Sequence, residues 1–107
     1  MKKEIFTMRI KHIDQNNQKT NNNYEYISRN AQLLNQFLHE HKEVKLAAMG
    51  PASTYNVFKI IGLSQATLKA RGENLVAEEF YVEPVTLTLP DGSESKGKIN
   101  CIHVCLV

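Results

Sequence analysis

The stretch Val44-Lys-Leu-Ala-Ala-Met-Gly-Pro51 decides the fold, because it joins a short apolar segment to a Gly-Pro pair. Residues 44–49 contain no turn-forming residue, so they predict a buried strand. Gly50 permits a tight turn, and proline is favoured at the first position of a helix. The sequence therefore predicts that a strand over 44–49 turns directly into a helix over 51–71.

The helix predicted after Gly50 has one apolar stripe and a defined end. Gly72 is the expected stop, and the two cations of the last turn complement the helix dipole. Gly62 costs about 1 kcal/mol relative to alanine inside a helix, so it indicates either simple tolerance or close packing against a neighbour. The stripe residues recur at helical spacing: Val57, Ile60, Ile61, Ser64 and Leu68.

Three segments precede this unit. Residues 4–13 alternate apolar and polar side chains, as in Phe6-Thr-Met-Arg-Ile10, and predict a strand. Residues 14–23 are rich in Asn and Gln and hold no apolar residue, so they predict a solvated loop. Residues 24–40 place Ile27, Ala31, Leu34 and Leu38 on one helical stripe.

The C-terminal third predicts a long hairpin. Residues 74–89 predict a strand in which Pro84 indicates an edge position or a bulge. Pro90-Asp-Gly-Ser93 is a turn signal, and residues 96–107 form the closing strand. The order β-α-β-α-β-β predicts one domain over 1–107, an α/β two-layer sandwich with two helices on one face of a four-stranded mixed sheet.

This order and spacing resemble an Alba-like domain over about residues 5 to 107. The resemblance rests on residues 44–50, the helix over 52–69, Glu78-Glu-Phe-Tyr-Val-Glu-Pro-Val85, the hairpin over 91–99 and Ile102-His-Val-Cys-Leu106. The apolar residue before Gly50 is nearer the eukaryotic branch, which includes small subunits of ribonuclease P and MRP particles. The resemblance implies a dimeric protein that binds RNA or DNA. Archaeal members carry Lys and Arg around this junction, whereas Ala47, Met49, Pro51 and Tyr55 are uncharged here.

Composition limits how such binding would work. Thirteen Lys and Arg face eleven Asp and Glu, a net charge of +2, which argues against a polycation that binds by charge alone. No apolar run approaches the roughly 18 residues of a membrane span, so no membrane partner is expected.

In a strand Cys101 and Cys105 would lie roughly 13 Å apart, too far for a disulfide. We therefore expect reduced thiols in an intracellular protein, nuclear or cytoplasmic.

The candidate nucleic-acid contacts are cations and one hydroxyl. Lys19 and Thr20 lie in the Asn-rich loop, whose alternative interpretation is a compositionally biased insertion. Lys96 and Lys98 lie on the hairpin, where Asp91 and Glu94 largely cancel their charge and a solvated turn is the alternative. Each of the remaining cations is individually more typical of a solvated surface: Arg29, Lys45 and Lys59.

The closing strand also predicts a partner, because its last half is apolar on both faces and helices can cover only one. The expected dimer or partner interface comprises Tyr55, Phe58, Phe80, Ile102 and Val104. The partner would be a second copy or another Alba-like chain, and a dimer would double whatever basic surface exists.

Nothing in the sequence requires an enzyme, a cofactor or a metal. Cys101, His103 and Cys105 share one strand face, but about 6.6 Å separates neighbouring Cα atoms there and zinc spacing such as C-x-x-C is absent. His39 and His41 do not face each other on a helix, so the pair does not indicate a catalytic or metal site.

The sequence leaves three hypotheses for the function of the protein. They are a nucleic-acid-binding dimer, a non-catalytic assembly subunit of a larger protein or ribonucleoprotein complex, and a small-molecule or catalytic domain.

Overall fold

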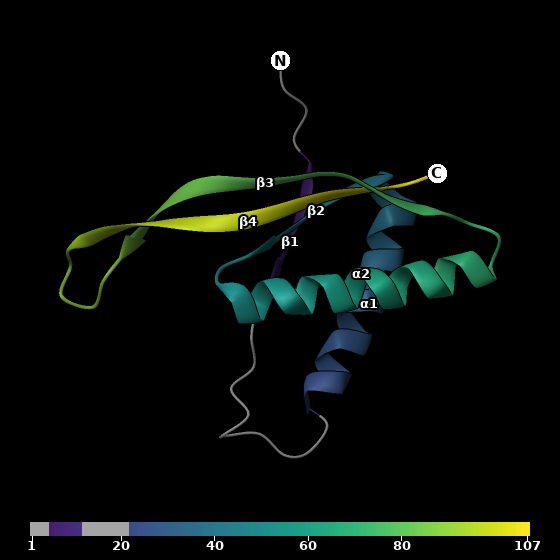
Figure 1. Cartoon of the computed structure of the whole chain (residues 1–107), viewed down its shortest axis with the longest axis horizontal. Coiled ribbons are helices and arrows are strands. Elements are labelled where there is room, and N and C mark those ends of the chain that lie inside the picture. Colours follow the sequence, from purple (N-terminus) through teal and green to yellow (C-terminus); the bar gives the residue numbers. More distant parts are fainter. Residues whose placement is uncertain (1–4, 12–21) are drawn as a thin grey trace.

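A computed structural model describes residues 5–11 and 22–107 of the chain. Six elements follow one another in the predicted order (Figure 1). They are β1 (Phe6–Ile10), α1 (Asn22–His41), β2 (Glu43–Ala48), α2 (Pro51–Ala70), β3 (Leu75–Thr88) and β4 (Glu94–Leu106).

The four strands form one mixed sheet in the order β1-β2-β4-β3. β1 pairs with β2 in parallel, and the other two pairings are antiparallel. Both helices cover the same face, and the β3–β4 hairpin extends beyond the start of α2 (Figure 1). The predicted α/β two-layer architecture is therefore confirmed.

The main core lies between the sheet and the two helices. Val44 and Leu46 of β2 are fully buried there, together with Leu34 of α1 and Ile60 of α2. Ile102 and Val104 of β4 belong to the same core, with exposed fractions of 4% and 0%. Their prediction as partner-facing residues is wrong, because they lie on the strand face that the helices already cover.

The opposite face of the sheet has a smaller apolar cluster. Ala47, Ile99 and Cys101 are buried there, with Tyr81 and Val85 packed against them. No helix of the described chain covers this face, so β-strand side chains alone shield the cluster (Figure 1). The thiols of Cys101 and Cys105 are both free, as predicted.

The hairpin decides between the two alternatives that Pro84 left open for β3, an edge position or a bulge. β3 is an edge strand, as Pro84 indicated. Its register breaks between Ala77 and Glu79, so Glu78 is the bulged residue, whereas Pro84 pairs regularly with Lys98. Proline is tolerated in regular pairing here because an edge strand has one side that needs no ladder donors.

The turns follow the predicted glycine chemistry. Gly50 adopts φ 86°, and its carbonyl accepts bonds from both the amide and the hydroxyl of Thr54 in the first turn of α2. Gly72 adopts φ 79° directly after the C-cap of α2. A Cβ at Gly62 would meet nothing within 4 Å, so close packing does not explain that glycine. Neither α1 nor α2 is long and apolar enough to cross a membrane.

Candidate nucleic-acid interface

The hairpin presents two of the predicted cations together. Lys96 and Lys98 are exposed on β4, where they pair with Thr86 and Pro84 of β3. Since they lie two residues apart, both point to the same face of the strand. Lys19 and Thr20, the predicted contacts of the Asn-rich segment, lie outside the described residues.

The first turns of α2 lie on the same side of the sheet as the hairpin lysines. Asn100 continues the face of Lys98, and its amide donates to the Thr54 hydroxyl over 2.9 Å. Lys59 is exposed one turn further along α2, with its Nζ atom 4.5 Å from the centroid of the Tyr55 ring. The structure therefore brings Lys59 to the side of the sheet that carries Lys96 and Lys98.

The other two predicted cations lie elsewhere. Lys45 projects from the opposite face of the sheet, where its Nζ atom is 3.3 Å from a carboxylate oxygen of Glu83. Arg29 is exposed on α1. Neither residue joins the hairpin cations, because strand alternation and the α1 helix direct them to other surfaces.

Two further cations lie at the strand–helix junction, and the sequence analysis did not identify them. Arg9 and Lys11 line a cavity of about 200 Å³ together with Ala47, Met49 and Ser53. Parallel pairing of β1 with β2 brings the carboxyl ends of both strands to the start of α2. The sequence did contain a signal for this site, because Arg9 and Lys11 lie near the end of the first predicted strand. The signal could be used only if that strand was assumed to pair in parallel with the 44–49 strand.

The backbone of Lys11 is held firmly at this junction. Its amide donates to the Tyr26 hydroxyl over 2.7 Å, and its carbonyl accepts from the Asn56 amide over 3.0 Å. Within the described part of the chain, neither Arg9 nor Lys11 has a carboxylate within ion-pairing distance. The uncharged residues next to Gly50 are therefore bordered by cations that come from another strand.

An exposed aromatic patch lies between α2 and β3. We define the patch as Tyr55, Phe58, Phe80 and Val82, which are 60%, 53%, 54% and 49% exposed. The rings of Phe58 and Phe80 stack with centroids 6.3 Å apart. Three of the five predicted interface residues, Tyr55, Phe58 and Phe80, therefore lie together on the surface.

The comparison with solved structures identifies this arrangement of sheet, helices and hairpin. The chain superposes on Alba from Thermoplasma volcanium with a TM-score of 0.58. The match covers 92% of this chain and 99% of that chain, at 12% sequence identity. The chain has an Alba-like fold. The sequence matches no family model and no curated protein sequence.

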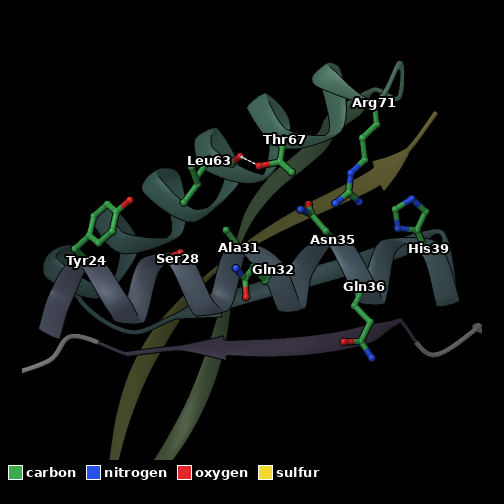
Figure 2. Close-up of a pocket in the computed structure, with 10 residues that line it drawn as sticks. All are labelled: Tyr24, Ser28, Ala31, Gln32, Asn35, Gln36, His39, Leu63, Thr67 and Arg71. Carbon is green, nitrogen blue, oxygen red and sulfur yellow. Dashed lines mark hydrogen bonds between the residues drawn. The ribbon is translucent and has the colours of Figure 1, made fainter. Parts of the chain in front are cut away.

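The Alba-like chain also has a polar cavity of about 360 Å³ between α1 and α2 (Figure 2). Asn35 and Arg71 line one end of it, near His39 (Figure 2). The imidazole of His39 lies 2.6 Å from a carboxylate oxygen of Glu73. The amide oxygen of Asn35 accepts a hydrogen bond from the buried hydroxyl of Ser64.

The two thiols of the Alba-like fold are poor nucleophiles. Burial raises the pKa of Cys101. Burial, a hydrogen bond to Glu78 and the charges of Glu78 and Glu43 raise the pKa of Cys105 to about 11. Because thiolates are the reactive form, these shifts disfavour reaction of either thiol.

Proposed function

We propose that this Alba-like chain binds RNA, DNA or both as a dimer and is not an enzyme. The observation that carries the proposal is the placement of exposed cations at two points of the fold. Lys96 and Lys98 project from the hairpin, and Arg9 and Lys11 border the start of α2. The similarity of the fold to that of Alba also supports the proposed binding of nucleic acid.

The junction suits a phosphate on physical grounds. The N-terminus of a helix offers unpaired amide groups and a positive dipole end, both of which favour anions. Arg9 and Lys11 add two positive charges beside the first turn of α2. Lys19 and Thr20 belong to the same proposal, since the segment that contains them follows Lys11 directly.

Dimerisation through the aromatic patch belongs to the proposal as well. Aromatic residues are enriched in protein interfaces and often dominate their binding energy. Tyr55, Phe58 and Phe80 expose about half or more of their surfaces, and Lys59 lies over the Tyr55 ring. The partner is a second copy or another Alba-like chain, and a more basic partner would raise the low charge of +2.

A salt titration tests the binding. Fluorescence anisotropy measures the affinity for a labelled RNA hairpin and a DNA duplex between about 50 and 200 mM salt. Each double variant, K96A/K98A or R9A/K11A, removes about two phosphate contacts. The slope of log affinity against log salt concentration therefore falls by about 2, and binding weakens about tenfold or more. Lys69→Ala, an exposed lysine at the other end of α2, is the matched control and leaves binding unchanged. Absence of binding at low salt, both alone and with a copurified partner chain, contradicts the proposal.

A second candidate is an assembly subunit with little direct nucleic-acid contact, as in the eukaryotic branch with small ribonuclease P and MRP subunits. The lack of charge at the strand–helix junction favours this candidate, because the residues there are Ala47, Met49, Pro51 and Tyr55. Copurification with a more basic chain, together with binding that survives K19A/K96A, supports this candidate against the first. Both candidates include a nuclear or cytoplasmic location, which imaging of the tagged chain tests.

A further inference from the structure

His103 lies between two glutamates on the sheet face opposite the helices. Its Nε2 atom is 3.6 Å from an oxygen of Glu43, and its Nδ1 atom is 3.7 Å from an oxygen of Glu78. One donor atom from each residue lies within 4.8 Å of the other two. We propose that Glu43, Glu78 and His103 form a site for a divalent transition-metal ion, for which zinc is the best match.

Three strands build this site. Glu43 of β2 pairs with Cys105 of β4, two residues from His103, so the glutamate and the imidazole share a face. Glu78 is the extra residue of the β3 bulge, opposite His103 and Val104. A bulge re-aims a side chain relative to regular alternation, and here the carboxylate of Glu78 reaches the imidazole.

The imidazole has an unsatisfied nitrogen. The His103 side chain is 12% exposed, and its Nε2 atom is buried without a hydrogen-bond partner. A buried polar atom without a partner destabilises the folded state. Ligation of a metal by the Nε2 lone pair would remove that cost.

The charge around the imidazole also favours a cation. Among the described residues, Glu43 and Glu78 form ion pairs with His103 alone. Lys45, the partner of His103 in the β2–β4 register, bonds Glu83 instead. The Cys105 thiol also hydrogen-bonds Glu78. The two carboxylates therefore share one imidazole and one thiol and have no Lys or Arg within ion-pairing distance among the described residues.

The donor set and its spacing suit zinc. Zinc binds imidazole nitrogen and carboxylate oxygen at about 2.0–2.2 Å, which places tetrahedral ligand atoms roughly 3.3–3.6 Å apart. The separation of 3.6 Å between the His103 Nε2 atom and Glu43 meets that spacing. The Glu78 oxygen is 3.7 Å from Nδ1, the other ring nitrogen, and all three donor atoms lie within 4.8 Å of one another. Calcium and magnesium prefer sites made of oxygen alone. The Glu43 and Glu78 side chains are 41% and 49% exposed, which gives an ion access from solvent.

This site is independent of the proposed nucleic-acid function, and it differs from the Cys101–His103–Cys105 set, whose spacing argued against zinc in the sequence. The two glutamates come from β2 and β3, so only the folded sheet assembles the ligands. The experiment that tests the metal site therefore needs no nucleic acid.

The experiment titrates Zn²⁺ into the reduced, metal-free full chain by calorimetry and follows the imidazole nitrogens by NMR. The expected result is one tight site per chain, with the His103 ring signals shifted. His103→Gln abolishes this site, and Glu43→Gln and Glu78→Gln each weaken it at least tenfold. The matched controls are His39→Gln, whose imidazole faces the single carboxylate of Glu73, and His41→Gln. Both controls leave the affinity unchanged.

Equal zinc affinity in the wild type and His103→Gln overturns the proposal. Shifts confined to His12, His39 and His41, the other histidines of the chain, overturn it as well. If circular dichroism shows that His103→Gln does not fold, E43Q/E78Q decides, because Glu78 is exposed and the Glu43 side chain is half-buried, 41% of it being exposed. Zinc raises the Tm of the wild type but not of E43Q/E78Q, and an equal rise in both contradicts the site.

Discussion

The rings of Phe58 in α2 and Phe80 in β3 stack at an interplanar angle of 12° although more than half of each residue is exposed. The pair therefore holds two large apolar side chains at a defined orientation on the surface, beside Tyr55 and Val82. Such a preordered pair costs little further side-chain entropy when a second chain covers it.

Replacement of Phe80 by alanine is expected to weaken the proposed dimer about thirtyfold, because buried aromatic anchors contribute about 2 kcal/mol or more to interfaces. Sedimentation equilibrium measures the change. Val76→Ala is a matched control, since Val76 is an exposed apolar residue of the same strand that pairs with Cys105 on the other face. Equal dissociation constants for the two variants would exclude the aromatic patch as the interface.

The bond from Ser64 in α2 to Asn35 in α1 predicts an effect on stability. Ser64 is fully buried and Asn35 is 7% exposed. Ser64→Ala leaves the buried amide without this partner and is expected to lower the free energy of unfolding by about 1–3 kcal/mol. Urea denaturation of S64A, N35A and S64A/N35A measures the coupling between the two residues. Strictly additive losses would show that the hydrogen bond contributes nothing.

Lys42 predicts a stabilising substitution. It adopts φ 70° after α1, with its amide bonded to the Leu38 carbonyl and its carbonyl bonded to the Leu106 amide. Non-glycine residues pay about 1 kcal/mol in this conformation, so Lys42→Gly is expected to raise the free energy of unfolding by about that amount. Lys42→Val serves as the opposite control and is expected to lower it. Chemical denaturation tests both, and a destabilised glycine variant contradicts the prediction.

The hairpin turn predicts a change in acid–base behaviour. The side-chain hydroxyl and the amide of Ser93 both donate to Asp91, and these bonds lower the pKa of that carboxyl. Their stabilising effect is therefore present above the unfolded pKa and is lost as the pH falls through the lower folded value. Ser93→Ala removes one donor and is expected to raise the pKa of Asp91 towards its ordinary value in an NMR titration. Ser95→Ala, two residues further along the chain in β4, is the control. An unchanged Asp91 pKa in S93A would show that the Ser93 hydroxyl does not lower it.

Local patterns predicted the elements well because they depend on neighbouring residues. The Gly50-Pro51 pair located the start of α2, and Gly72 located its end. The apolar strand β4 was different: alternation could not tell which of its two apolar faces the helices cover. The buried positions of Ile102 and Val104 correct the expected interface for that reason.

The candidate sites were only partly predictable, because their residues come from different strands. The lysines of the hairpin could be identified because both lie on one strand, β4, two residues apart. Arg9 and Lys11 could not, since only the parallel pairing of β1 and β2 brings them to the start of α2.

The sequence by itself determined the order of strands and helices and the low net charge, because periodicity, turn chemistry and composition are local properties. Only the tertiary structure decided which face of β4 is core, which cations border Gly50, and that His103 meets Glu43 and Glu78. These depend on strand pairing between distant segments and on a bulge at Glu78, neither of which has a signal in neighbouring residues.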